Sequence, residues 1–148
     1  MILTNRETYW KRWNRLSVFE RITFFKATVA LLIIKLGLTV LPFSNFRKLF
    51  HWFSTTTRQR EISQNQIEQT AWAVRSAADH LPFELLCLPR ALATKFLLRN
   101  VSSLTLEIGV EINSSKIFEA HAWVERNGSV IIGNWPDTVS YKRLWVWE

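Results

Sequence analysis

Cysteine is nearly absent from this sequence: Cys87 is the single cysteine among 148 residues. One cysteine cannot form an internal disulfide, which excludes the small secreted proteins that disulfides hold together. It also excludes sites that need several thiolates, such as four-cysteine zinc sites and iron–sulfur clusters. Aspartate and histidine are scarce as well, with two and three residues, so any catalytic group of side chains must come from a short inventory.

The few histidines also argue against a metal. His51, His80 and His121 are scattered along the chain, whereas zinc ligands recur at short, recognisable spacings. The sequence therefore predicts neither a metal site nor a bound cofactor.

The formal net charge of +7 favours anionic partners. Nucleic acid is not expected among them, because no recognised nucleic-acid-binding motif accompanies the basic residues.

Hydrophobic residues, by contrast, make up 48% of the chain, enough to exclude disorder and to build a core. Composition separates a helical, apolar and basic N-terminal region with a linker, residues 1–60, from a compact domain, residues 61–148. The linker is the polar stretch 54–60. Periodicity in the compact domain predicts two helices and three strands, over residues 63–80, from Cys87 onward, and over 104–112, 118–125 and 130–132, with a hairpin turn at Asn127-Gly128.

The N-terminal region contains one long apolar run, residues 22–43. Ser17 and Glu20 have the spacing of a capping box, which predicts a helix start there, and Pro42 is expected to end the helix. A membrane span is not predicted, because Lys26 and Lys35 interrupt the run. Two placements stay open: packing into this protein or a partner, and peripheral contact with a membrane. No signal-peptide pattern is present, so a cytoplasmic location is expected, with membrane contact through the apolar helix as an option.

Cys87 is expected at the N-terminus of a helix. Residues 88–98 are good helix-forming sequence, and Pro89 is tolerated only in a first helical turn. The unpaired N–H groups and the dipole at a helix N-terminus favour negative charge, which suits a thiolate nucleophile and an oxyanion. The alternative is that this lone cysteine is a small buried hydrophobic residue.

His121 is expected on a strand. Alternation over residues 118–125 places it on one face with Glu119, Trp123 and Glu125. An imidazole held on a rigid strand and shielded by Trp123 is a credible general base for a thiol. The alternative is an ordinary exposed strand histidine. The two glutamates are interpreted as surface carboxylates.

Three segments together resemble a known family. They are Cys-Leu-Pro-Arg-Ala-Leu-Ala at 87–93, Ile-Gly-Val at 108–110, and Phe-Glu-Ala-His-Ala-Trp-Val-Glu at 118–125 with Gly128 after it. They closely resemble the transglutaminase-like cysteine peptidases of lasso-peptide biosynthesis. The match is strongest over about 63–144, and the apolar N-terminal half resembles the helical front of the standalone members, which have no fused leader-recognition domain.

The resemblance implies an α+β fold with a papain- or transglutaminase-like core, in which the helix of Cys87 packs on a small antiparallel sheet. It implies that Cys87 is the nucleophile and His121 the base, and that the reaction removes the leader from a ribosomally made precursor peptide. The implied partners are the precursor, a separate leader-recognition protein, and an asparagine-synthetase-like cyclase that closes the macrolactam.

The third catalytic position departs from the family pattern, in which an aspartate orients the histidine. By register that aspartate falls at or next to Gly133. Asn134 is the favoured substitute, Asp137 is a second candidate from the following loop, and a backbone carbonyl is a third. Arg90 and Trp123 are interpreted as substrate-binding residues, although Arg90 fits a solvated helix position equally well.

Two other functions remain open on the same residues. One is transglutaminase-type acyl transfer, which would join two molecules instead of cutting one. The other is a non-catalytic module whose basic, tryptophan-rich surface binds a peptide or a membrane.

Overall fold

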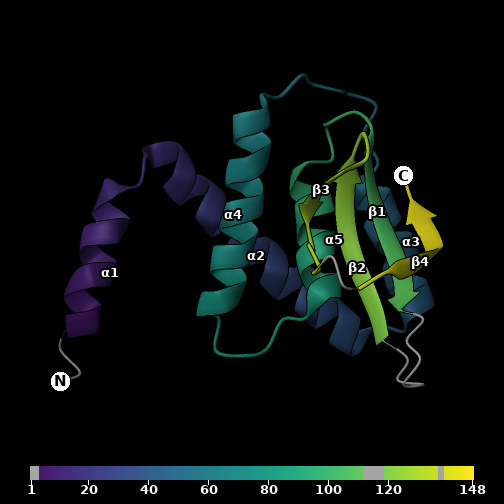
Figure 1. The fold of residues 1–148 in the computed structure, drawn as a ribbon, viewed down its shortest axis with the longest axis horizontal. Coiled ribbons are helices and arrows are strands. Elements are labelled where there is room, and N and C mark those ends of the chain that lie inside the picture. Colours follow the sequence, from purple (N-terminus) through teal and green to yellow (C-terminus); the bar gives the residue numbers. More distant parts are fainter. Residues whose placement is uncertain (1–3, 112–118, 137–138) are drawn as a thin grey trace.

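Helices make up the first two thirds of the fold, and a sheet makes up the rest (Figure 1). The structure is a computed structural model, and it describes residues 4–111, 119–136 and 139–148. In these residues the elements are α1 Thr4–Arg15, α2 Val18–Val40, α3 Phe43–Ser54, α4 Gln64–His80, α5 Cys87–Leu97, β1 Leu104–Glu111, β2 Glu119–Arg126, β3 Ser129–Ile132 and β4 Tyr141–Trp147. The strands form one antiparallel sheet in the order β3-β2-β1-β4. The predicted α+β class is confirmed.

Local sequence signals set several of these boundaries. The Ser17 side chain accepts a hydrogen bond from the backbone N–H of Glu20, and the Glu20 carboxylate accepts one from the N–H of Ser17, so the predicted capping box is present. α2 ends at Val40, two residues before Pro42, as expected. The β2–β3 turn has positive φ at Asn127 and Gly128, as a tight hairpin requires.

One buried cluster joins the N-terminal helices to the rest of the chain. α5 packs on β1 and β2, and α2 packs on α4 and α5, so the sheet, these two helices and α2 lie in successive layers (Figure 1). The buried cluster includes Leu31 of α2, Phe50 of α3, Leu92 of α5, Leu106 of β1 and Val124 of β2. Side chains from both sides of residue 60 therefore share one core.

α2 is the helix that, in the part of the chain described, is long and apolar enough to cross a membrane. Its residues Ala27, Leu31 and Ile34 are nevertheless buried against the protein. Packing within the protein, one of the two placements expected from sequence, is therefore confirmed for this face. The opposite face of α2 remains exposed.

β4 was not predicted from the sequence. It pairs antiparallel with β1 and forms one edge of the sheet. Most of its side chains are exposed, so it lacks the alternation of buried and exposed residues that marks a half-buried strand. Its first residue, Tyr141, takes part in the site described next.

Candidate active site

Cys87 is the first residue of α5, as the position of Pro89 predicted. The residue before the helix, Leu86, provides no side-chain cap to the N-terminal N–H groups. The backbone N–H groups of Cys87 and Leu88 belong to the first helical turn, so they have no hydrogen-bond partner within the helix. A half-buried thiol thus lies at a helix end whose donors are open to an acceptor.

Arg90 fixes the segment that leads into α5. Its Nε donates to the carbonyl oxygen of Leu85 at 2.8 Å, and its Nη2 pairs with Asp79 Oδ1 at 2.8 Å. These contacts tie the start of α5 to the end of α4. The structure therefore gives Arg90 a bracing role, with its side chain 30% exposed, and its expected substrate contact stays a prediction.

His121 lies on β2, and a backbone carbonyl fixes its ring. Its Nε2 lies 2.6 Å from the carbonyl oxygen of Gly133. A carbonyl oxygen only accepts, so Nε2 carries the proton, and in the neutral ring Nδ1 keeps its lone pair. Of the three candidate orienting groups, the backbone carbonyl is the one that contacts the ring among the described residues. The favoured side chain, Asn134, is exposed, and Asp137 lies outside the described residues.

Gly133 can present this carbonyl because it has no side chain. Its φ is +89°, a conformation that L side chains rarely adopt. A Cβ at this position would lie 2.7 Å from the carbonyl oxygen of Ala122 and 2.8 Å from Cβ of Trp123. Gly133, one of the positions at which the resemblance places an aspartate, therefore has no space for a side chain.

Aromatic rings enclose His121. Tyr141 stacks on it with ring centroids 4.9 Å apart, Trp135 meets it edge-on at 5.8 Å, and Trp123 lies parallel to it at 6.2 Å. The shielding role expected of Trp123 fits this geometry. Its substrate-binding role does not, because Trp123 is only 1% exposed. Sequence reasoning missed Trp135 and Tyr141 as neighbours of the histidine.

Tyr141, which stacks on His121, has a raised pKa. Burial raises the pKa of Tyr141 above its usual 10.0, and the negative charges of Glu111, Glu119 and Cys87 raise it further. α5 contacts β2, and both elements begin at the same end of the molecule (Figure 1). The helix that begins at Cys87 therefore packs on the strand that carries His121.

A comparison with protein families identifies this arrangement. The family model described as the transglutaminase-like superfamily matches residues 29–146, most of the chain. The chain belongs to the transglutaminase-like superfamily. No curated protein and no solved structure matches it. The superfamily fold is compatible with cysteine peptidase activity and with acyl transfer.

The sheet of this chain carries a buried ionic cluster beside the aromatic rings. Glu107 is 2% exposed and Glu125 is 8% exposed, so the surface position expected for Glu125 is wrong. Arg143 of β4 lies 2.7 Å from Glu107 Oε2 and 3.0 Å from Glu125 Oε2. Trp123 Nε1 donates to the same Glu125 oxygen at 3.2 Å. The cluster therefore anchors the indole that backs His121. Burial and the charge of Glu125 raise the pKa of Glu107, an effect that Arg143 reduces.

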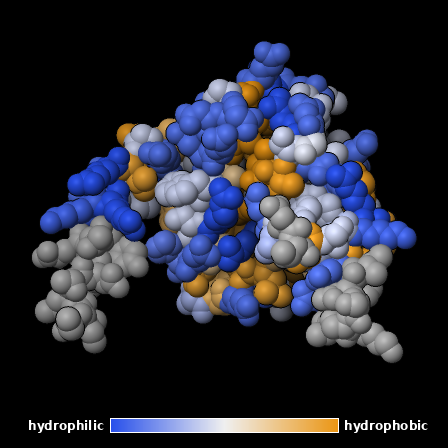
Figure 2. Space-filling model, in the orientation of Figure 1, coloured by the Kyte–Doolittle hydropathy of each residue, from blue (hydrophilic) through white to orange (hydrophobic). Residues whose placement is uncertain are grey.

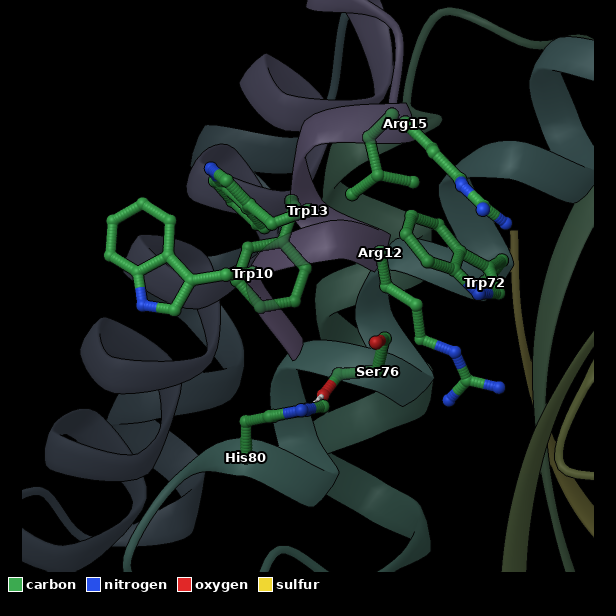
Figure 3. A pocket seen from close by; sticks show the side chains of 9 residues that line it. Trp10, Arg12, Trp13, Arg15, Trp72, Ser76 and His80 are labelled. Atoms are coloured by element: carbon green, nitrogen blue, oxygen red, sulfur yellow. Dashed lines mark hydrogen bonds between the residues drawn. The ribbon is translucent and has the colours of Figure 1, made fainter. Parts of the chain in front are cut away.

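A cavity of about 850 Å³ lies elsewhere in this superfamily member, between α1 and α4 (Figure 3). In Figure 3, α1 supplies Trp10, Arg12 and Trp13 to the lining, and α4 supplies Trp72, Ser76 and His80. Neither Cys87 nor His121 lines this cavity. It is thus separate from the candidate active site.

Proposed function

We propose that the chain is a cysteine peptidase in which Cys87 is the nucleophile and His121 the general base. The observation that carries the proposal is the bond between His121 Nε2 and the Gly133 carbonyl. It leaves Nδ1 as the basic nitrogen, on a strand against which the helix that begins at Cys87 packs. Membership of the transglutaminase-like superfamily supports thiol-based acyl chemistry.

The reaction proceeds in two halves. His121 Nδ1 takes the proton from the Cys87 sulfur, and the thiolate attacks the carbonyl carbon of the scissile peptide bond. The resulting oxyanion accepts hydrogen bonds from the backbone N–H groups that begin α5. Protonated His121 gives its proton to the leaving amine, the C–N bond breaks, and a thioester remains. Water then attacks the thioester with His121 as base, which releases the acid and restores the thiol.

The proposed substrate is the leader of a ribosomally made lasso-peptide precursor. The motifs around Cys87 and His121 that resemble the leader peptidases support this choice. The proposed partners are a separate leader-recognition protein and an asparagine-synthetase-like cyclase, which would use the amine released by cleavage. The proposed location is the cytoplasm, where ribosomal precursors are made.

Substitution of the nucleophile tests the proposal directly. Precursor and recognition protein are incubated with wild-type enzyme, Cys87→Ala, His121→Gln and the control His51→Gln, whose exposed imidazole lies on α3. We expect mass spectrometry to detect leader and core peptides with wild type and His51→Gln only. Continued cleavage by Cys87→Ala would refute the assignment.

Transglutaminase-type acyl transfer is a second candidate, favoured by the superfamily itself. In that reaction an amine, instead of water, attacks the thioester. Product masses decide between the two, because hydrolysis gives two peptides and transamidation gives a cross-linked or amine-tagged one.

A non-catalytic binding module is a third candidate, favoured by the cavity lined with Trp10, Trp13 and Trp72. A thiol-reactive probe tests it. If Cys87 reacts near neutral pH no faster than a free thiol in a short peptide, a binding role is favoured over catalysis.

A further inference from the structure

α2 exposes a continuous stripe of large apolar side chains. The members follow one another at intervals of four or three residues, apart from one adjacent pair: Val18, Ile22, Phe25, Val29, Leu32, Ile33, Leu36 and Val40. On a helix with 3.6 residues per turn they fall within a sector of about 100°. Their exposed fractions run from 38% to 72%. Figure 2 shows apolar side chains reaching the surface where α2 begins, next to α1.

Basic side chains border the stripe on both sides. At 100° per residue, Lys26 lies just beyond one edge, and Arg21 and Lys35 lie beyond the other. Charge is also divided unevenly along the chain. Residues 1–60 carry 11 lysines and arginines and two glutamates, a formal +9, whereas residues 61–148 carry eight basic and ten acidic residues, a formal −2. The segment that exposes the apolar stripe therefore carries all of the net positive charge.

We propose that α2 lies in the plane of an anionic lipid bilayer and inserts this stripe into the headgroup region. An apolar face with lysine and arginine at its borders is suited to that position, because the side-chain stems extend to the phosphates. The inference is independent of the proposed peptidase function.

α2 lies on the bilayer and does not cross it. A crossing helix must expose its whole circumference to lipid or to other membrane helices. Ala27, Leu31 and Ile34 instead form part of the protein core with α4 and α5. A second copy of the chain is disfavoured as the occupant, because pairing two stripes would bring two +9 segments together.

Vesicle co-sedimentation with the full chain tests the proposal. The vesicles contain phosphatidylcholine alone or phosphatidylcholine mixed with phosphatidylglycerol. Leu36→Glu changes a stripe residue that is 65% exposed, and Leu144→Glu is the matched control on β4, where the leucine is 61% exposed. Lys35→Gln is compared in the same way with the exposed Lys142→Gln. Circular dichroism checks that each variant is folded.

We expect wild type to bind the anionic vesicles and to dissociate at high salt. Leu36→Glu should weaken binding at least about tenfold, and Lys35→Gln roughly fivefold, while Leu144→Glu and Lys142→Gln change it little. Absence of binding, or equal losses in both leucine variants, would overturn the proposal. So would a wild-type dimer in light scattering that Leu36→Glu converts to a monomer, since the occupant would then be a second copy.

Discussion

Substitution of Gly133 by alanine tests whether its carbonyl positions the catalytic base. The new Cβ would lie 2.7 Å from the Ala122 carbonyl oxygen and 2.8 Å from Cβ of Trp123. Both obstacles belong to β2, the strand that carries His121, so neither can move without moving that strand. The loop must therefore shift outward, and the carbonyl moves away from His121 Nε2.

The expected loss of stability has two parts. An L side chain at φ +89° costs roughly 1–2 kcal/mol. Forcing an extra methyl group into packed structure costs about 1–3 kcal/mol more. The sum of roughly 2–5 kcal/mol is a large fraction of the 5–15 kcal/mol typical of a domain, but it leaves a folded population to assay at low temperature.

Gly128→Ala is the matched control. Gly128 has a similar φ of +81°, but no heavy atom lies within 4 Å of an added Cβ. It should therefore lose only the conformational part, roughly 1–2 kcal/mol, and keep full activity. Urea unfolding of both variants isolates the steric part as the difference between them.

Leader cleavage completes the test. Because a misplacement of about 1 Å near the reacting groups can cost roughly a hundredfold in rate, kcat of Gly133→Ala should fall by about that factor relative to Gly128→Ala. Nitrogen NMR of the His121 ring should show the proton on Nε2 in wild type and a mixture of tautomers in Gly133→Ala. If Gly133→Ala matches Gly128→Ala in both stability and kcat, the carbonyl does not position the histidine.

Two further predictions concern the same face of the sheet. Burial and the charge of Glu125 raise the pKa of Glu107, so the ionisation of Glu107 opposes folding at neutral pH. Glu107→Gln should therefore unfold at a higher urea concentration than wild type at pH 7. This gain should vanish below about pH 4, where glutamate is protonated in both the folded and the unfolded state. A gain that persists at low pH would contradict this cause. Tyr141→Phe keeps the ring stacked on His121 and should cleave leader within about threefold of wild type, whereas Tyr141→Leu should lose about tenfold; equal losses would assign the effect to the hydroxyl group.

Local signals in the sequence predicted the parts of the site that depend on neighbouring residues. Pro89 located the start of α5 and hence Cys87, because proline fits only the first turn of a helix. Asn127 and Gly128 located the β2–β3 hairpin, because both adopt positive φ. His121 followed from the resemblance and from its position on the predicted strand.

The remaining parts depend on contacts between residues far apart in sequence. Tyr141 reaches His121 only because β4 pairs with β1, and β4 has no alternation to predict it. Glu125 was assigned to a solvated face because alternation identifies a polar face without showing what covers it. Here Arg143 covers that face. The Gly133 carbonyl is a backbone group, and no residue type marks which carbonyl a histidine will contact.

A carbonyl in place of a carboxylate separates two tasks that the aspartate of a nucleophile–histidine–aspartate triad combines. It accepts a hydrogen bond from the N–H of Nε2 and so fixes the tautomer as a carboxylate would, but it carries no charge to stabilise an imidazolium. Negative charge is nevertheless present nearby, since Glu111 and Glu119 pair across β1 and β2 and both act on Tyr141, which stacks on His121. In this chain the backbone therefore orients the histidine, and the two carboxylates lie opposite each other at the facing ends of β1 and β2.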